Sequence, residues 1–319
     1  MFGNSYFTMR IFTDVIRISF LSLLYVVVVG CSGACSFVQT KVKPSVHKFP
    51  VSSFVQIRSE TLWEGCEKDP ATDTDKCQKA VMRAVSSGAY IRHSEVDPSI
   101  SYVLTAGHSC RSTKKPDAMI GGVKVKHLGQ RFIVVDYNGF KQEGVVSAID
   151  TRFDMCLMTI SNVYIKTPII RLAENNPTRG EVVYNMAAPH GIVFPRMVLT
   201  FDGYFAGFTP EGFAMYTIPT KPGSSGSPIV NINNELVGII FAGYRSMENI
   251  GVASPLVALK VFLRNAIVKA EMKQWQKMNK SVDKTVTTTT DMIKYMHESL
   301  SKYFHISPVK NNGINSVIK

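Results

Sequence analysis

The sequence predicts an all-β fold in which antiparallel strands form a barrel or a sandwich. Between about Lys48 and Leu263, short runs rich in β-branched and aromatic residues are separated by Gly, Pro, Asn and Asp. No helical period lies between these runs, and this spacing is typical of antiparallel sheets rather than of alternating strands and helices. The predicted strands include Ser53–Arg58, Gly88–Arg92, Tyr102–Thr105, Arg131–Tyr137, Gly144–Ile149, Cys156–Ile160, Glu181–Ala187, Pro228–Ile232 and Glu235–Ala242.

The composition is that of a globular protein with a basic surface. The chain has 319 residues, of which 45% are hydrophobic, enough for a packed core. A formal net charge of +12 favours contact with anionic surfaces. The lysines are scattered, however, and no nucleic-acid-binding motif is present. We therefore expect a solvated basic surface and no specific nucleic-acid partner.

The first thirty residues have the pattern of an export signal. Arg10 and Arg17 precede an apolar run, Ile18–Val29, that is short for a membrane-spanning helix and typical of a signal core. The run leads into Val28-Val29-Gly30-Cys31, which resembles the lipobox of bacterial lipoproteins and implies that Cys31 carries lipid. A plain secretory signal and an uncleaved membrane anchor are the alternatives. All three place the rest of the chain outside the cytoplasm, either membrane-associated or secreted.

Four further cysteines lie in the main part of the chain, where an extracytoplasmic location permits disulfides. Cys66 and Cys77 flank a short polar stretch, and an oxidised pair that staples this loop is favoured over two free thiols. The sequence does not decide whether Cys110 and Cys156 form a disulfide or remain free thiols. No Cys-x-x-Cys pair is present, so a structural zinc site is not expected.

The character of the sequence changes after Pro255. Apolar residues at helical spacing predict a helix over Leu256–Met278, followed by a low-complexity linker at Ser281–Thr290 and a second helix at Asp291–Phe304. The predicted organisation is a signal or anchor at 1–30, a linker at 31–47, the main domain at 48–265 and a helical, low-complexity tail at 266–319.

Three separate segments carry residues suited to nucleophilic catalysis. The predicted strand Tyr102–Thr105 leads through two small residues to His108, Asp154 precedes an apolar run, and Ser225 lies in a Gly- and Ser-rich turn. Attack by a serine hydroxyl on an amide needs a base, an acid that orients the base, and donors for the oxyanion. Glycines at 223 and 226 allow a tight turn that exposes the hydroxyl and gathers backbone amides.

The sequence motifs of these segments resemble those of chymotrypsin-like serine peptidases. Thr105-Ala106-Gly107-His108 matches their Thr-Ala-x-His element. Gly223–Pro228 matches the Gly-x-Ser-Gly-Ser-Pro of bacterial glutamyl endopeptidases and is close to the Gly-x-Ser-Gly-Gly-Pro of trypsins. The similarity covers about Val51 to Leu263. Further stretches are similar to peptidases of the high-temperature-requirement (HtrA) type, namely Ser86–Ile91, Gly144–Ile160, Ala187–Gly191, Val237–Gly243 and Asn249–Pro255.

This resemblance implies two six-stranded antiparallel β-barrels with an active site in the cleft between them, and a C-terminal helical tail. It assigns a His108, Asp154 and Ser225 triad, and it favours Asp154 over Asp150 as the acid. The oxyanion hole would be formed by the backbone N–H groups of Gly223 and Ser225. The implied activity is that of a serine endopeptidase acting on polypeptides, without a metal or organic cofactor.

The chain departs from the relatives at two points that bear on regulation and specificity. Ser224 replaces the aspartate that precedes the trypsin nucleophile, so activation through a new terminal amine is not expected. No carboxylate lies in the predicted substrate pocket, and Ile240 replaces a histidine of glutamyl endopeptidases. We therefore expect a small or apolar side chain before the scissile bond. The predicted pocket residues are Pro219, Thr220, Phe241, Ala242 and Gly243.

Two other readings compete with a protease acting on other proteins. One is a catalytically silent barrel used for binding, and the other is a self-processing chain with a structural or virion-associated role. The roughly fifty residues after Leu263 are too few and too rich in Lys and Thr for the PDZ domain of HtrA-type enzymes.

Overall fold

The computed structural model describes residues 48–68, 71–111, 118–120, 123–161, 167–244 and 246–279. The chain divides into two units, Met1–His47 and Lys48–Lys319, and every described residue belongs to the second. The predicted signal segment with Cys31, the linker at 281–290 and the helix at 291–304 therefore lie outside the described residues. Within the described ranges, no helix has both the length and the apolar character needed to cross a membrane.

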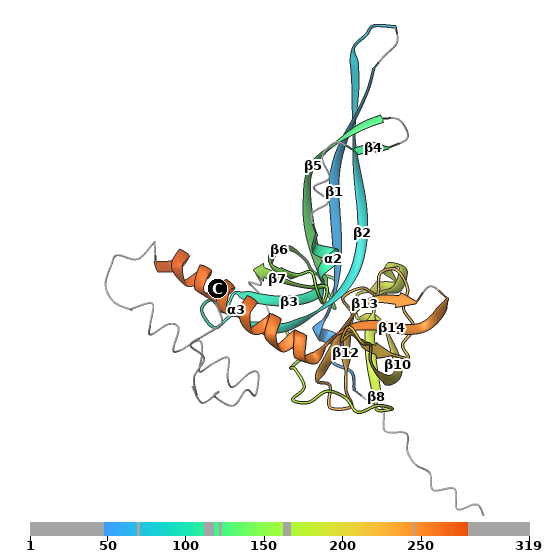
Figure 1. Ribbon diagram of the computed structural model, residues 1–319. Helices are drawn as coiled ribbons and strands as arrows, with labels where there is room; N and C mark the ends of the chain where they lie inside the picture. Colours follow the sequence, from blue (N-terminus) through green and yellow to red (C-terminus); the bar gives the residue numbers. More distant parts are fainter. Residues whose placement is uncertain are drawn as a thin grey trace, which may run out of the picture. The chain divides into compact units, whose positions relative to one another are not determined.

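Six antiparallel strands close the first barrel (Figure 1). In the order β1-β2-β3-β7-β6-β5 each strand pairs with the next, β5 pairs with β1 to complete the ring, and β4 adds to β5. A turn of 3₁₀ helix, η1, precedes β1, and a short helix, α2, follows β3. The elements are η1 (Val51–Ser53), β1 (Phe54–Lys68), β2 (Asp75–His93), β3 (Ile100–Ala106), α2 (Gly107–Cys110), β4 (Ala118–Ile120), β5 (Val123–Asp136), β6 (Lys141–Asp150) and β7 (Met155–Ser161).

A second ring of six antiparallel strands follows in the chain. Its order is β11-β14-β13-β12-β8-β10, closed by pairing between β10 and β11, and β9 adds to β10. The chain therefore has the chymotrypsin-like fold of two closed barrels, as the resemblance implied. The elements are β8 (Val182–Ala187), η2 (Pro189–Gly191), β9 (Val193–Phe194), β10 (Met197–Phe208), β11 (Ala214–Tyr216), β12 (Pro228–Val230), β13 (Leu236–Tyr244), β14 (Met247–Pro255) and α3 (Leu256–Asn279).

Strands β3 and β7 are buried on both faces, which explains why they read as continuous apolar runs. Along β7, Cys156 and Met158 point into the core of the first barrel, whereas Met155 and Leu157 join a larger core shared with the second barrel and α3. Alternate residues of a strand face opposite sides of the sheet, so a strand between two cores has no polar face. The pairing of β3 with β7 thus holds His108, which follows β3, and Asp154, which precedes β7, near the centre of the molecule.

Strands β1, β2 and β5 extend far beyond the first barrel as a long ribbon, here called the arm (Figure 1). The strands β1 and β2 pair without interruption from Phe54↔Ala89 to Lys68↔Asp75. The sequence predicted only the barrel end of each strand, because most of β2 is exposed on both faces and lacks the apolar alternation on which that prediction rests.

The outer part of the arm is held by a disulfide and by charged pairs. Cys66 and Cys77 are directly opposite each other and form a disulfide, which confirms the predicted oxidised pair and places it across two paired strands. Nearer the barrel, Arg83 and Arg131 flank Glu60 from both neighbouring strands. Hydrogen bonds from Arg131 and then Arg83 hold the pKa of the Glu60 carboxyl below its ordinary value.

Helix α3, predicted over Leu256–Met278, continues directly from β14 and packs against β6 and β7 of the first barrel as well as β13 and β14 of the second. It runs without a break through residues 265 and 266, where the predicted domain boundary lies. Its buried Glu271 carboxylate accepts the Ser94 hydroxyl at 2.8 Å and the amides of Glu95 and Val96 at 3.3 Å each. Burial, reinforced by Glu271, raises the pKa of the nearby Tyr102 phenol. The helix is thus tied by polar contacts to the loop before β3.

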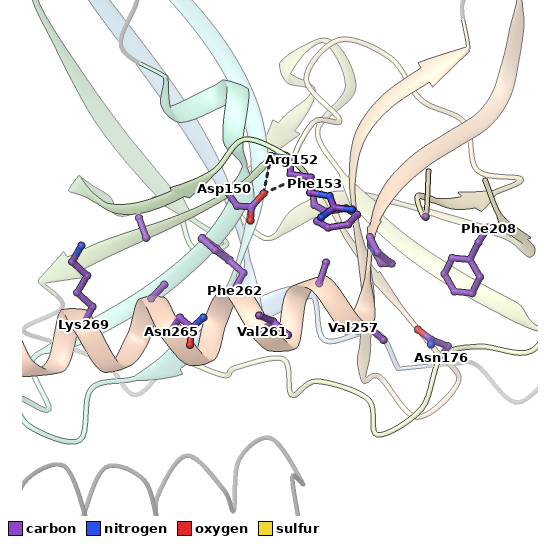
Figure 2. A pocket seen from close by; sticks show the side chains of 15 residues that line it. Asp150, Arg152, Phe153, Asn176, Phe208, Val257, Val261, Phe262, Asn265 and Lys269 are labelled. Carbon is purple, nitrogen blue, oxygen red and sulfur yellow. Dashed lines mark hydrogen bonds between the residues drawn. The ribbon is translucent and has the colours of Figure 1, made fainter. Parts of the chain in front are cut away.

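An apolar groove of about 770 Å³ lies beside the first half of α3 (Figure 2). The helix contributes the exposed side chains of Val257 and Val261, and the facing wall includes the turn between β6 and β7. Within that turn, the Asp150 carboxylate accepts the backbone N–H groups of Arg152 and Phe153 at 2.8 Å each. The Asp150 carboxylate therefore stabilises the turn in which it lies.

Candidate active site

His108 lies in α2, immediately after β3, where the chain passes close to Asp154. The amide of Gly107 donates to the carbonyl oxygen of Asp154 at 2.7 Å. A Cβ on Gly107 would lie 3.0 Å from the carbonyl carbon and Oδ1 of Asp154, so glycine allows a close approach here. The His108 side chain is 44% exposed and that of Asp154 only 12%. The imidazole therefore rests on a buried carboxylate and keeps one side open to solvent.

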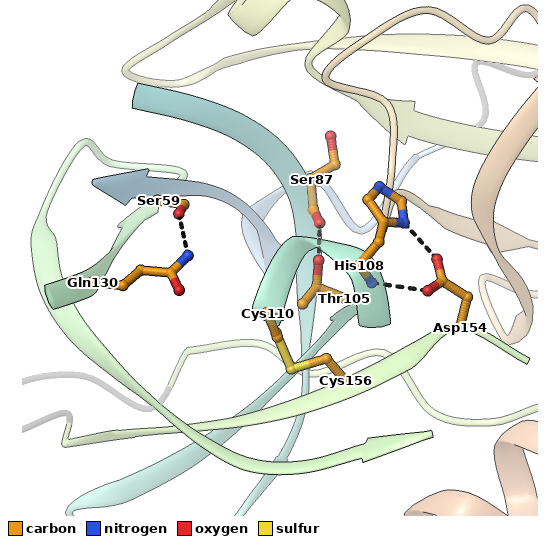
Figure 3. The surroundings of a disulfide bond; sticks show 8 residues. All are labelled: Ser59, Ser87, Thr105, His108, Cys110, Gln130, Asp154 and Cys156. Atoms are coloured by element: carbon orange, nitrogen blue, oxygen red, sulfur yellow. Dashed lines mark hydrogen bonds and ion pairs between the residues drawn. A yellow bond between two sulfur atoms is a disulfide. The ribbon is translucent and has the colours of Figure 1, made fainter. Parts of the chain in front are cut away.

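Asp154 holds His108 through two hydrogen bonds (Figure 3). Its Oδ2 lies 2.5 Å from His108 Nδ1, and its Oδ1 accepts the backbone N–H of His108 at 2.8 Å. Because a carboxylate accepts, the hydrogen of the neutral ring belongs on Nδ1, and Nε2 is left as the acceptor. The pair thus has the tautomer and orientation that a general base requires.

Two further features of Asp154 bear on its role. Its backbone has φ +53°, a left-handed conformation that is uncommon outside glycine and that clusters at functional sites. The Arg111 guanidinium lies 3.3 Å from Oδ1, so the carboxylate faces a permanent cation as well as the imidazole. Of the two candidate aspartates, Asp154 contacts His108 and Asp150 does not.

Ser225 lies in the turn between Lys221 and Pro228, which depends on two glycines. Gly223 has φ +97° and Gly226 has φ +84°, conformations that side chains rarely adopt. A Cβ on Gly226 would lie 2.1 Å from the carbonyl oxygen of Ser87, and one on Gly223 would lie 2.4 Å from that of Ala188. The turn is therefore shaped by close approach to β2 and to the end of β8.

Ser87, which is fully buried on β2, connects three segments around this turn. Its amide donates to the carbonyl oxygen of Ser225 at 2.8 Å, and its hydroxyl donates to that of Gly223 at 2.8 Å. The same hydroxyl accepts the amide of Ala188 at 3.0 Å. Thr105, three residues before His108, donates its hydroxyl to the Ser87 carbonyl oxygen at 2.7 Å. One strand of the first barrel thus positions the serine turn of the second.

The amides of Gly223 and Ser225 donate to no acceptor among the described residues. The carbonyl oxygen of Pro222 accepts the amide of His190 at 2.6 Å. In a trans peptide the C=O and N–H groups point in opposite directions, so this bond turns the Gly223 N–H away from His190. Two unpaired donors on either side of Ser224 have the arrangement of an anion-binding site.

His108, Gly223 and Ser225 line one cleft of about 430 Å³ that continues onto the arm. No hydrogen bond joins the His108 ring to the Ser225 hydroxyl among the described residues, and such bonds are often long before substrate binds. Within the same ranges, no cluster of three His, Cys, Asp or Glu side chains offers a metal site.

The predicted pocket residues gather beside β13 rather than in this cleft. Gly243 lies against Thr220, since a Cβ added at Gly243 would be 3.0 Å from the Thr220 Cβ. Phe241 contacts Phe213 edge to face, with ring centroids 5.2 Å apart. Pro219, Phe241 and Ala242 are half-buried.

The second disulfide links the histidine and aspartate segments (Figure 3). Cys110 lies two residues after His108, and Cys156 lies two residues after Asp154. Both are buried in the core of the first barrel. Cys110 and Cys156, whose state the sequence did not decide, are therefore bonded to each other.

Comparisons with known proteins agree with this architecture. A family model described as the trypsin-like peptidase domain matches residues 86–239, just under half of the chain, and supports a chymotrypsin-like serine peptidase. No curated protein matches the sequence significantly.

The structure of this chain resembles those of two proteases, among other solved structures. The first is the serine endoprotease from Yersinia pestis, with 19% identity, a TM-score of 0.48 and coverage of 68% of this chain. The present chain spans only 63% of the length of that protein. The second is a protease from M. tuberculosis in its active form, with 15% identity, a TM-score of 0.47, and coverage of 68% of this chain and 82% of that chain.

Sequence reasoning did not identify Ser87 or Arg111 as part of the site. The Ser86-Ser87-Gly88 stretch was noticed only for its similarity to a family strand. The available signal is a serine pair just before the apolar run Ala89–Ile91, since a buried hydroxyl needs partners. Arg111 carries no comparable signal, because surface arginines near a turn are common.

We expect the Cys110–Cys156 disulfide to matter more for stability than the Cys66–Cys77 disulfide. Chain-entropy arguments give about 4 kcal/mol for a loop of this size and about 3 kcal/mol for the shorter one. Urea unfolding of Cys110→Ala/Cys156→Ala should show a global loss of free energy of unfolding. Cys66→Ala/Cys77→Ala is the matched control, and an equal or larger loss there would contradict the expectation.

Proposed function

We propose that this protein is a serine endopeptidase that hydrolyses polypeptides through His108, Asp154 and Ser225. The observation that carries the proposal is the Asp154–His108 pair, which opens into the same cleft as Ser225 and the two unpaired amides. The match of residues 86–239 to a trypsin-like peptidase domain supports this activity. The motifs place the chain near the HtrA-type and glutamyl-endopeptidase branch.

The chemistry follows from the orientation of each group. His108 Nε2 accepts the Ser225 proton as Oγ bonds to the scissile carbonyl carbon, and Asp154 stabilises the imidazolium. The amides of Gly223 and Ser225 donate to the oxyanion, each contributing on the order of 3 kcal/mol. Collapse expels the amine, which takes the proton from His108. Water, deprotonated by His108, then releases the acyl group and regenerates Ser225.

We propose that the residue before the scissile bond is small or apolar. The proposed pocket of Pro219, Thr220, Phe241, Ala242 and Gly243 contains no charged side chain. The neighbouring Lys221 and Glu248 pair with each other at the exposed rim. A basic substrate residue would therefore find no free carboxylate in the pocket, and an acidic residue would find no free cation.

We propose further that the protein works outside the cytoplasm, anchored through a lipid on Cys31. The two disulfides support an oxidising location. Mass spectrometry of the mature protein should find an N-terminal diacylglyceryl-Cys31. A free N-terminus beyond Cys31 would contradict the anchor while leaving the peptidase proposal intact.

A fluorophosphonate probe tests the nucleophile directly. The wild-type protein should be labelled, and Ser225→Ala should lose the label because Ser225 is the proposed nucleophile in the cleft that His108 lines. Ser224→Ala, a neighbouring buried serine, is the matched control and should retain labelling. Folded wild-type protein that never labels would instead favour the silent binding barrel. Cleavage of Ser225→Ala protein by the active form separates action in trans from self-processing.

Ser87→Ala should reduce the turnover of protein that is still folded, and it should also lower the free energy of unfolding by about 1–3 kcal/mol because it leaves a buried carbonyl and a buried amide unpaired. The substitution frees the carbonyl of Gly223 and the amide of Ala188, so the oxyanion donors lose support. Since removing a donor outright costs roughly 100- to 1000-fold in kcat, we expect about a tenfold loss in kcat with KM little changed.

The matched control is Ser53→Ala, another fully buried serine, whose hydroxyl has no partner in the described part of the chain. Steady-state kinetics and thermal melting of both variants provide the measurement. Equal kcat values for Ser87→Ala and Ser53→Ala would rule out the positioning role.

A further inference from the structure

The cleft does not end at Ser225 but continues along one face of the arm. Most of its lining residues on β1, β2 and β5 share one face, where Thr61 is paired with Met82 on one side and with Gln130 on the other, and Arg83 and Val85 line it from the alternate positions of β2. Side chains at alternate positions share a face, so Ser59, Thr61 and Trp63 lie in one row. The cleft is therefore a groove that runs from the proposed nucleophile onto the three-stranded arm.

The groove lies on the side of Ser225 where the leaving group departs. None of the five residues of the proposed acyl-side pocket lines it. It is lined instead by His108, Ser109 and Arg111, next to the imidazole that protonates the departing amine. A substrate whose acyl residue occupies the pocket beside β13 would direct its C-terminal side into this groove.

The length of the groove can be judged from β2. Ser86 adjoins Ser87, whose amide binds the Ser225 carbonyl, and the lining continues to Met82. Four strand steps span about 13 Å, which accommodates about four residues of an extended peptide. This is a segment of substrate rather than a single side chain.

The character of the lining changes along this path. Near Ser225 the side chains are small, namely Ser86, Ala84 and Ser59. Farther out the groove is lined by Met82, which is 58% exposed, and by Trp63, whose ring contacts His127 edge to face. An exposed methionine beside a tryptophan suits a bulky apolar partner.

Three polar atoms at the far end have no partner among the described residues, and one of them is Nε2 of His127, the residue directly opposite Trp63. The indole Nε1 of Trp63, a residue that is 8% exposed, is buried without an acceptor, and the side-chain Oε1 of Gln130 is buried without a donor. The Gln130 amide nitrogen is used, since it donates to Ser59 Oγ at 2.8 Å. Buried polar atoms are almost always paired in native proteins, so a missing donor and a missing acceptor indicate a ligand with both.

We propose that the arm is a substrate-binding element that holds about four residues after the scissile bond, with a bulky apolar side chain against Trp63 and Met82. A peptide backbone supplies both the acceptor for the indole N–H and the donor for the glutamine oxygen. The preferred substrate is an unfolded or extended segment with an apolar residue beyond the cleavage site. This inference rests on the proposed peptidase activity.

The test uses the full-length protein and a peptide taken from a site that it cleaves in denatured casein. Peptides with the same acyl side are shortened residue by residue after the scissile bond. Removal of the apolar residue that reaches the arm should lower kcat/KM by about tenfold or more, as is usual for loss of an apolar contact in a pocket.

Matched variants separate the groove from the rest of the arm. Met82→Ser should lower kcat/KM for the long peptide and leave the shortest peptide unaffected. Val81→Ser, at the adjacent exposed position on the opposite face, should behave as wild type with both peptides. Trp63→Phe keeps an aromatic ring, although a smaller one, and removes the indole N–H, and it should also affect only the long peptide.

Each outcome decides between the two proposals. Cleavage that is independent of peptide length, or equal effects of Met82→Ser and Val81→Ser, would overturn the arm as a substrate-binding element while leaving the peptidase intact. Absence of both cleavage and fluorophosphonate labelling would overturn the peptidase, and the arm proposal with it.

Discussion

The contact between buried Ser87 and the serine turn is the constraint on which the site depends. Each barrel contributes only part of the chemistry, so their relative position decides whether His108 and Ser225 share a cleft. Ser87 holds the two barrels in this position with its backbone and its side chain. Its amide binds the carbonyl of Ser225, and its hydroxyl binds the carbonyl of Gly223 and the amide of Ala188. Buried hydrogen bonds of this kind are directional, whereas the apolar contact between the barrels is not.

The glycines follow from the same constraint. Gly226 lies where a methyl group would overlap the Ser87 carbonyl, and Gly107 lies where one would crowd Asp154. Both allow backbone to approach backbone more closely than any other residue would. The shared apolar core behind them resists separation of the barrels, while α3 covers one side and is fastened through Glu271.

The sequence predicted antiparallel strands from local apolar runs, and the resemblance of its motifs to those of chymotrypsin-like peptidases implied the two closed barrels that the structure shows. A continuous apolar run marks strands such as β13, and glycine next to serine marks the turn at Ser225. The length of the arm was not predicted, since strands exposed on both faces carry no hydrophobic period. Arg111 and Ser87 were missed for a related reason, as their importance arises from contacts between residues far apart in the chain. The triad and the pocket residues remain predictions that rest on motif and geometry.

The disulfide between Cys110 and Cys156 has a topological consequence. The covalent ring that it closes runs from Cys110 to Cys156 and contains Asp154, and His108 lies just outside it, two residues before Cys110. Thermal breathing that opens the hydrogen bonds between β3 and β7 cannot carry these two side chains far apart. Fluctuations that disassemble the site must therefore begin on the serine side, where non-covalent contacts alone maintain alignment.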